Sequence, residues 1–181
     1  LDIKILNVEE KEKLEKTKKI LPNKMQKEAL KNLSFLRDKG KDKALIISAT
    51  GTGKTYLSAF DVKKFKAKRV LFLVHRENIL LSAKDSFENI LGEKFSYGLY
   101  TGNKKEQDKD YIFSTIQTMS NSYENFSSEQ FDYIIIDEAH HITSPSYKKV
   151  VDYFNPKFLL GLTATSNRMD GNSIYEVFDE N

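Results

Sequence analysis

The chain has 181 residues, of which 39% are hydrophobic and 30% are charged, and its formal net charge is +3. This balance predicts a soluble globular domain with a sizeable core, and the absence of cysteine excludes disulfides and thiolate metal sites. No apolar run approaches the roughly 20 residues of a membrane span and the N-terminus is polar, so we expect a cytoplasmic protein with no membrane association.

The N-terminal residues 1–20 mix lysine and glutamate, and we interpret them as a lead-in, either a solvated helix or a linker. The predicted domain therefore spans residues 21–181. Its first element is a helix that Asn23 caps and that runs to about Lys39, followed by Gly40 as a stop signal. Four apolar residues recur in this helix at helical spacing: Met25, Ala29, Leu33 and Leu36.

Short apolar segments then alternate with amphipathic ones. Strands are predicted at residues 44–48, 69–74, 95–100, 111–115, 133–136 and 158–162. Helices are predicted from the glycine-rich segment 50–55 onward, with Leu57 and Phe60 on one face, and at residues 79–91 before Gly92. Polar loops separate the later strands. This alternation predicts an α/β fold in which a mainly parallel sheet is flanked by helices on both faces.

A phosphate loop, residues 48–55, is predicted between the first strand and its helix, with the sequence Ser-Ala-Thr-Gly-Thr-Gly-Lys-Thr. Gly51 and Gly53 permit a tight turn whose N–H groups converge on phosphate oxygens at a helix N-terminus. Lys54 can reach the β- and γ-phosphates, and the Thr55 hydroxyl can ligate Mg²⁺. Ser48 stands where the general pattern has glycine, so a simple glycine-containing loop is the alternative. The expected nucleotide contacts are Ala49, Thr50, Gly51, Thr52, Gly53, Lys54 and Thr55.

Two carboxylates, Asp137 and Glu138, end the buried strand at residues 133–136. In a parallel sheet they reach the same edge as the phosphate loop, so Asp137 can hold Mg²⁺ and Glu138 can orient the attacking water and accept its proton. His140 and His141 follow. Because the chain has one other histidine and no cysteine, we do not expect zinc-type coordination, and Mg²⁺ is the expected metal.

Three motifs in this order resemble superfamily 2 DExH helicases and translocases: the phosphate loop, Asp137-Glu138-Ala139-His140, and Leu162-Thr163-Ala164-Thr165. Within that superfamily the chain is similar to the branch of type III restriction-enzyme helicase subunits, from Lys24 to about Asn181. The resemblance implies a RecA-like P-loop NTPase domain, the first motor domain of a nucleic-acid-dependent ATP hydrolase that uses ATP and Mg²⁺. It implies catalytic roles for Lys54, Asp137 and Glu138, and coupling roles for His140, Thr163 and Thr165.

Further positions match family motifs. Gln26 is similar to the glutamine that reads adenine, although a solvated glutamine on the helix face is the alternative. His75 and Arg76, and later Thr115 and Gln117, are similar to segments that contact the backbone of a bound strand. The alternatives are a helix-capping charge at Arg76 and a simple helix cap at Thr115 or Gln117.

The resemblance also implies partners. These are nucleic acid, with double-stranded DNA expected, and a second RecA-like domain that the 181 residues do not include. That second domain supplies arginine fingers in the family, so we expect the chain alone to bind ATP and Mg²⁺ but to hydrolyse ATP poorly, with Arg168 as the one candidate for a finger in cis. Two other function classes remain open: a P-loop NTPase of another class, such as a small-molecule kinase, and a nucleotide-switched binding module.

Overall fold

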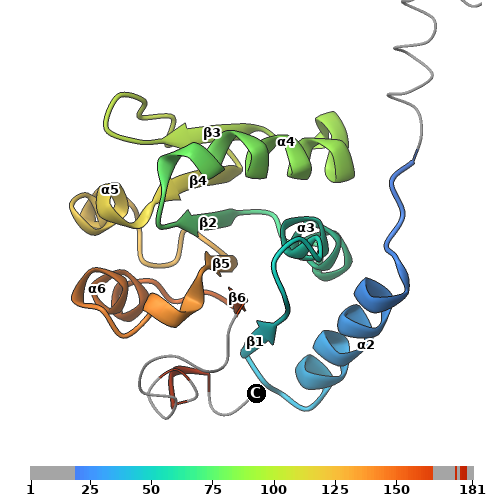
Figure 1. Cartoon of the computed structure of the whole chain (residues 1–181). Coiled ribbons are helices and arrows are strands. Elements are labelled where there is room, and N and C mark those ends of the chain that lie inside the picture. Colours follow the sequence, from blue (N-terminus) through green and yellow to red (C-terminus); the bar gives the residue numbers. More distant parts are fainter. Residues whose placement is uncertain (1–18, 165–173, 175, 179–181) are drawn as a thin grey trace, which may run out of the picture.

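A six-stranded sheet forms the centre of the molecule, with helices on both of its faces (Figure 1). The computed structural model describes residues 19–164, 174 and 176–178. The strands are β1 (Lys43–Ile47), β2 (Val70–Val74), β3 (Tyr97–Tyr100), β4 (Tyr111–Thr115), β5 (Tyr133–Asp137) and β6 (Phe158–Thr163). The α-helices are α2 (Lys24–Asp38), α3 (Lys54–Phe65), α4 (Leu80–Leu91), α5 (Ile116–Ser120) and α6 (Pro145–Tyr153). The 3-10 helices are η1 (Glu77–Ile79), η2 (Gly92–Lys94), η3 (Tyr123–Asn125) and η4 (Ala139–His141).

The strands lie in the order β1-β6-β5-β2-β4-β3, and every pairing between these strands is parallel. The predicted α/β fold is therefore confirmed. In a parallel sheet the carboxyl ends of neighbouring strands share one edge, and the connections that follow them gather there. The sheet order places β5 and β6 between β1 and β2, which brings segments distant in sequence to neighbouring positions on that edge.

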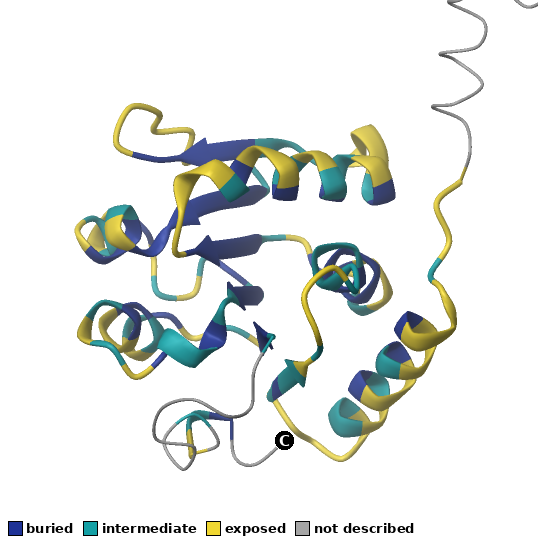
Figure 2. Cartoon of the chain, in the orientation of Figure 1, coloured by how far each residue is buried: buried dark blue, intermediate teal, exposed yellow. Residues whose placement is uncertain are grey.

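Successive side chains of a strand point to opposite faces of the sheet, so the sheet has a hydrophobic core on each face. Different helices cover these two cores. On one face, Phe72 and its neighbours pack with Leu33 of α2, Leu57 of α3 and Phe87 of α4. On the other face, Ile134 and its neighbours pack with α5 and α6, and Phe178 joins the same core. Strands β2 to β6 are largely buried, whereas the edge strand β1 is partly exposed, and the loops and outer helix faces are mostly exposed (Figure 2).

The predicted elements agree with the structure to within two residues at most ends. Glycine marks the helix ends as expected, since Gly40 and Gly92 both have positive φ, at 79° and 71°. The predicted apolar residues of α2 are confirmed except for Met25. Leu33 is buried, and Ala29 and Leu36 pack against the same core. Met25 is 54% exposed, and the polar Gln26 is buried in its place.

Helix α6 was not predicted from the sequence. Ser144 precedes it and Pro145 occupies its first turn, a position where proline is favourable because its missing N–H has no partner there. Tyr147 and Val150 are its buried residues. The Ser-Pro start and the spacing of those two residues are the signals that could have found this helix. Among the described residues, no helix is both long and apolar enough to cross a membrane.

Candidate nucleotide-binding site

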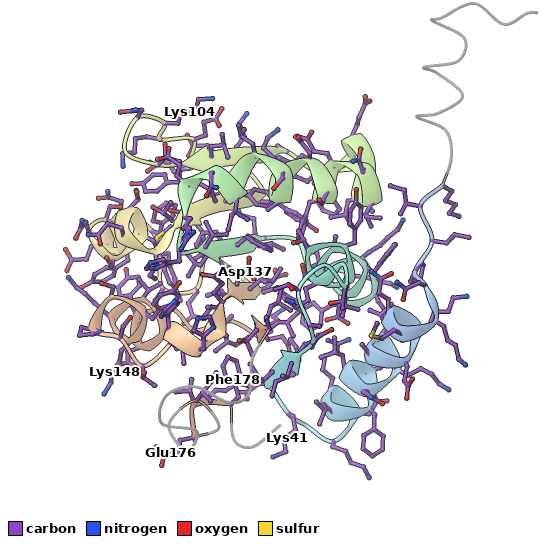
Figure 3. All side chains as sticks on the ribbon, viewed as in Figure 1. Lys41, Lys104, Asp137, Lys148, Glu176 and Phe178 are labelled. Carbon is purple, nitrogen blue, oxygen red and sulfur yellow. The ribbon has the colours of Figure 1, made fainter. Side chains whose placement is uncertain are left out.

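Except for Gln26 of α2, the predicted site residues lie at or just after the carboxyl ends of five strands, at one edge of the sheet. Register shows this directly: Ile47 of β1 pairs with Thr163 of β6, Leu73 of β2 with Ile136 of β5, and Val74 of β2 with Thr115 of β4. The segments that follow these strands therefore begin at the same level. Asp137, the last residue of β5, lies near the middle of the molecule (Figure 3).

The phosphate loop has the backbone that its glycines predict. Gly51 and Gly53 have φ of 77° and 76°, values that residues with a Cβ rarely adopt. Gly53 is the N-cap of the 12-residue helix α3, and no side chain caps the helix there. The first N–H groups of a helix lack partners within it, and the helix dipole favours an anion at that end. The strand–loop–helix geometry therefore suits a phosphate group.

Lys54 is held inside the phosphate loop. Its Nζ donates to the carbonyl oxygens of Ser48 at 2.8 Å and of Ala49 at 2.9 Å. Ser48, the departure from the general pattern, donates from its hydroxyl to Thr52 Oγ1 at 2.8 Å, and its N–H donates to the Thr163 carbonyl at 3.0 Å. Sequence reasoning missed this role, because the serine replaces an expected glycine and its partners lie elsewhere in the fold.

Gln26 is attached to the phosphate loop. Its side chain is buried, and its Nε2 donates to the Gly53 carbonyl oxygen at 3.1 Å. Its Oε1 accepts from the Asn23 N–H at 2.9 Å, while the Asn23 side chain accepts from the Gln26 N–H, which is a reciprocal capping box. The alternative of a solvated glutamine is therefore wrong. Reading of adenine by Gln26 stays a prediction.

The two carboxylates have different environments. Burial raises the pKa of Asp137, and the Glu138 charge adds to this, while a hydrogen bond from the Glu138 N–H and the Lys54 charge oppose it. Glu138 has φ 52° and ψ 48°, a left-handed conformation that is uncommon for a residue with a side chain. Such backbone strain often accompanies functional positions, because the surrounding structure must hold it in place.

A side-chain contact joins the acidic segment to β6. His140 Nδ1 lies 3.1 Å from Thr163 Oγ1, and Thr163 is buried. Coupling roles for His140 and Thr163 stay a prediction. Thr165 and Arg168, predicted for coupling and as a finger in cis, lie outside the described residues.

The residues predicted to contact nucleic acid share this edge but differ in exposure. His75, Arg76 and Gln117 are exposed, whereas Thr115 is only 8% exposed. The Thr115 hydroxyl accepts from the Thr118 N–H at 3.2 Å and caps α5, which is the alternative weighed from sequence. A phosphate contact therefore stays a prediction for the exposed Arg76 and Gln117. The Thr115 side chain instead caps the N-terminus of α5.

A family model described as "Type III restriction enzyme, res subunit" matches residues 19–168. The chain belongs to this family. The match includes the phosphate loop and the Asp137–Glu138 pair, so the res-subunit resemblance inferred from the motifs is confirmed.

Relatives of this res-subunit domain include helicases and restriction enzymes. The protein irc3 of Schizosaccharomyces pombe, provisionally named a mitochondrial ATP-dependent helicase, is 30% identical over 156 residues, covering 79% of this chain and 26% of that protein. The EcoAI type I restriction endonuclease subunit of Escherichia coli is 30% identical over 142 residues, covering 70% of this chain and 17% of that subunit. The chain thus spans about a quarter or less of these relatives.

The res-subunit domain also has the expected fold. The SWI2/SNF2 ATPase core of Sulfolobus solfataricus, solved in complex with double-stranded DNA, superimposes with a TM-score of 0.72 at 20% identity. The superposition covers 88% of this chain and 36% of that core. The predicted RecA-like fold is confirmed.

The residues present fit ATP with Mg²⁺. The phosphate loop offers N–H groups, a lysine and a helix N-terminus for the phosphates. Thr55 and Asp137 offer the hard oxygen ligands that Mg²⁺ prefers. Mg²⁺ bound there would neutralise phosphate charge that develops during hydrolysis.

Proposed function

We propose that this domain binds and hydrolyses ATP as half of a motor that moves along nucleic acid, with double-stranded DNA as the expected substrate. One observation carries the proposal: the phosphate loop, the two carboxylates and the His140–Thr163 contact meet at a single sheet edge. The relatives named above, with their helicase and restriction functions, support the same assignment.

Each residue has a chemical task in this proposal. Lys54 leaves the Ser48 and Ala49 carbonyls and binds the phosphates, while Thr55 and Asp137 hold Mg²⁺. Glu138 accepts the proton of the attacking water, because a carboxylate beside the phosphate group is the base that this reaction needs. The displaced phosphoryl group then leaves as inorganic phosphate, and ADP remains.

The His140–Thr163 contact supports a route from ATP to nucleic acid. Thr163 ends β6, and its carbonyl also accepts from Ser48 of the phosphate loop. A change at the nucleotide site therefore has two short paths into β6, one from the phosphate loop and one from the acidic segment. Thr165 extends this segment, and we propose that it shares the coupling role.

We propose that Arg76 and Gln117, with His75 beside them, contact the phosphates of a bound strand. Their exposure at the carboxyl edge of the sheet supports this placement. Binding should weaken as salt rises and should depend little on base sequence, because phosphates are the target.

We further propose a second RecA-like domain that closes over the ATP site and supplies arginine fingers, which are worth roughly 10³ to 10⁵ in rate. The first 20 residues serve as a lead-in to residues 21–181 in this scheme. The chain alone should hydrolyse ATP slowly, and adding the second domain should raise the rate by orders of magnitude.

Glu138→Gln in a form of the protein that carries the second domain tests the proposal. The variant should bind ATP as the wild type does and lose turnover, with and without DNA. Glu93→Gln, an exposed change on η2, is the matched control and should retain the wild-type rate. Wild-type turnover by Glu138→Gln would contradict the catalytic assignment. If DNA does not stimulate ATP turnover, the result would favour another class of P-loop NTPase. If the wild type binds ATP but does not hydrolyse it, the result would favour a nucleotide-switched binding module.

A further inference from the structure

The three histidines of the chain are contiguous in space, although His75 is far from the other two in sequence. The rings of His75 and His141 stack with centroids 4.9 Å apart, and the rings of His140 and His141 lie 4.1 Å apart. One candidate ligand atom each from Glu138, His140 and His141 lies within 4.8 Å of the others. This cluster differs from the expectation, based on the number of histidines and the absence of cysteine, that the chain has no zinc-type site.

Local geometry explains why Glu138 and His141 meet. Glu138 is the N-cap of η4 and His141 is the last residue of this single turn, so the two residues lie at opposite ends of a three-residue helix. His140 lies between them and turns its Nδ1 to Thr163. A small closure is enough for coordination, since bonds of about 2.0–2.1 Å place tetrahedral ligand atoms about 3.4 Å apart.

One nitrogen of the His140 ring already has a partner. A ligating histidine almost always uses its other nitrogen to hold a fixed partner, and the Nδ1 contact with Thr163 leaves Nε2 of His140 available.

We propose that Glu138, His140 and His141 form a site for Zn²⁺ or a similar divalent transition metal, distinct from the Mg²⁺ site of Thr55 and Asp137. Two imidazoles and one carboxylate are a donor set that suits Zn²⁺, whereas Mg²⁺ prefers oxygen ligands. His75 stacks against the site without ligating it.

Zinc at this site inhibits the motor. A coordinated Glu138 no longer accepts the proton of water, and a coordinated His140 is restrained beside Thr163. This consequence rests on the proposed function, whereas metal binding itself does not.

Titration of the nucleotide-free chain with ZnCl₂ in a non-coordinating buffer, followed by calorimetry, tests the site. We expect one equivalent to bind. His141→Ala should weaken binding by at least about tenfold, because a first ligand is worth no less than the outer partners of such sites. His75→Ala is the matched control, since it removes an imidazole from the same cluster, and it should change the affinity by less than about threefold.

A second measurement needs no variant. With three histidines in the chain, the imidazole ¹⁵N resonances can be assigned individually, and Zn²⁺ should shift one nitrogen each of His140 and His141 by the amount typical of ligation. Equal loss of affinity in both histidine variants, or ligation shifts confined to His75, would overturn the assignment. No saturable binding by the wild type would overturn it as well.

Measurements of ATP binding and hydrolysis distinguish failure of the zinc site from failure of the proposed ATPase function. Lys54→Ala should weaken ATP binding and keep Zn²⁺ binding. A wild-type chain that binds Zn²⁺ but no nucleotide would contradict the proposed function alone. In a form with the second domain, Zn²⁺ should slow ATP hydrolysis and a chelator should restore it. Zinc binding without inhibition would contradict the inhibitory consequence.

Discussion

Arg37 and Asp61 join the helix that carries Gln26 to the helix that follows the phosphate loop. The Arg37 guanidinium donates two hydrogen bonds of 2.7 Å to the two Asp61 oxygens, and Asp61 is fully buried. The Tyr133 hydroxyl of β5 donates to the same carboxylate, and the guanidinium lies over the Phe158 ring at 4.8 Å. The buried Asp61 carboxylate thus holds α2, α3 and β5 together beside the nucleotide site.

Arg37→Ala should destabilise the chain by about 3–5 kcal/mol, because it leaves the Asp61 carboxylate buried without its counter-charge. Urea unfolding measures this. The matched control is Arg69→Ala, which breaks the 3.6 Å pair with Asp110, where both side chains are more than a third exposed. That change should cost no more than about 1 kcal/mol. Similar losses in the two variants would show that burial of the pair is unimportant.

Tyr147→Phe should stabilise the chain by about 1 kcal/mol. The Tyr147 hydroxyl is buried and, among the described residues, lacks a hydrogen-bond partner, so folding strips it of water without compensation. Tyr111→Phe is the control, since the Tyr111 hydroxyl donates to the Ala67 carbonyl at 2.7 Å. That variant should lose about 1 kcal/mol. Thermal unfolding of both gives the signs, and a destabilised Tyr147→Phe would mean that its hydroxyl has a partner after all.

Asp110→Asn should destabilise the chain at pH 7 and have less effect at pH 3. A hydrogen bond from the Ser96 N–H lowers the pKa of Asp110. A hydrogen bond from the Ser96 hydroxyl and the positive charge of Arg69 lower this pKa further, while burial opposes them. The ionised form is therefore favoured in the folded state. Its stabilisation is present above the unfolded-state pKa of about 3.9 and is lost as pH falls through the lower folded-state value.

Urea unfolding of wild type and Asp110→Asn at both pH values measures this difference. Asp108→Asn, an exposed change in the same loop, is the control for the loss of a negative charge. A difference between wild type and Asp110→Asn that grows toward pH 3 would have the wrong sign for this explanation.

Lys54→Ala should weaken ATP binding by about 30- to 150-fold, since a charged hydrogen bond to phosphate contributes about 2–3 kcal/mol. Calorimetry with Mg²⁺–ATP measures this on the chain itself. Lys66→Ala, on the exposed residue that caps the far end of α3, is the control and should bind as the wild type does. Equal affinity of Lys54→Ala and wild type would show that the phosphate loop does not bind ATP.

Local sequence determined much of this protein. The glycines of the phosphate loop, the apolar strands and the helix ends at Gly40 and Gly92 depend on backbone preferences within a few residues. The carboxylates after β5 were recognisable for the same reason, because their position in a strand–turn segment is a local property. The order of motifs was sufficient for the family.

Tertiary structure decided the rest, because sheet order depends on contacts between distant segments. Periodicity predicted strands 69–74 and 133–136, but the pairing of β2 with β5 placed His75 against His141. The same long-range packing turned Gln26 inward against Gly53, where a polar residue on a helix would otherwise face water. It also placed the Thr163 hydroxyl beside His140 and its carbonyl opposite Ser48, because β6 lies between β1 and β5.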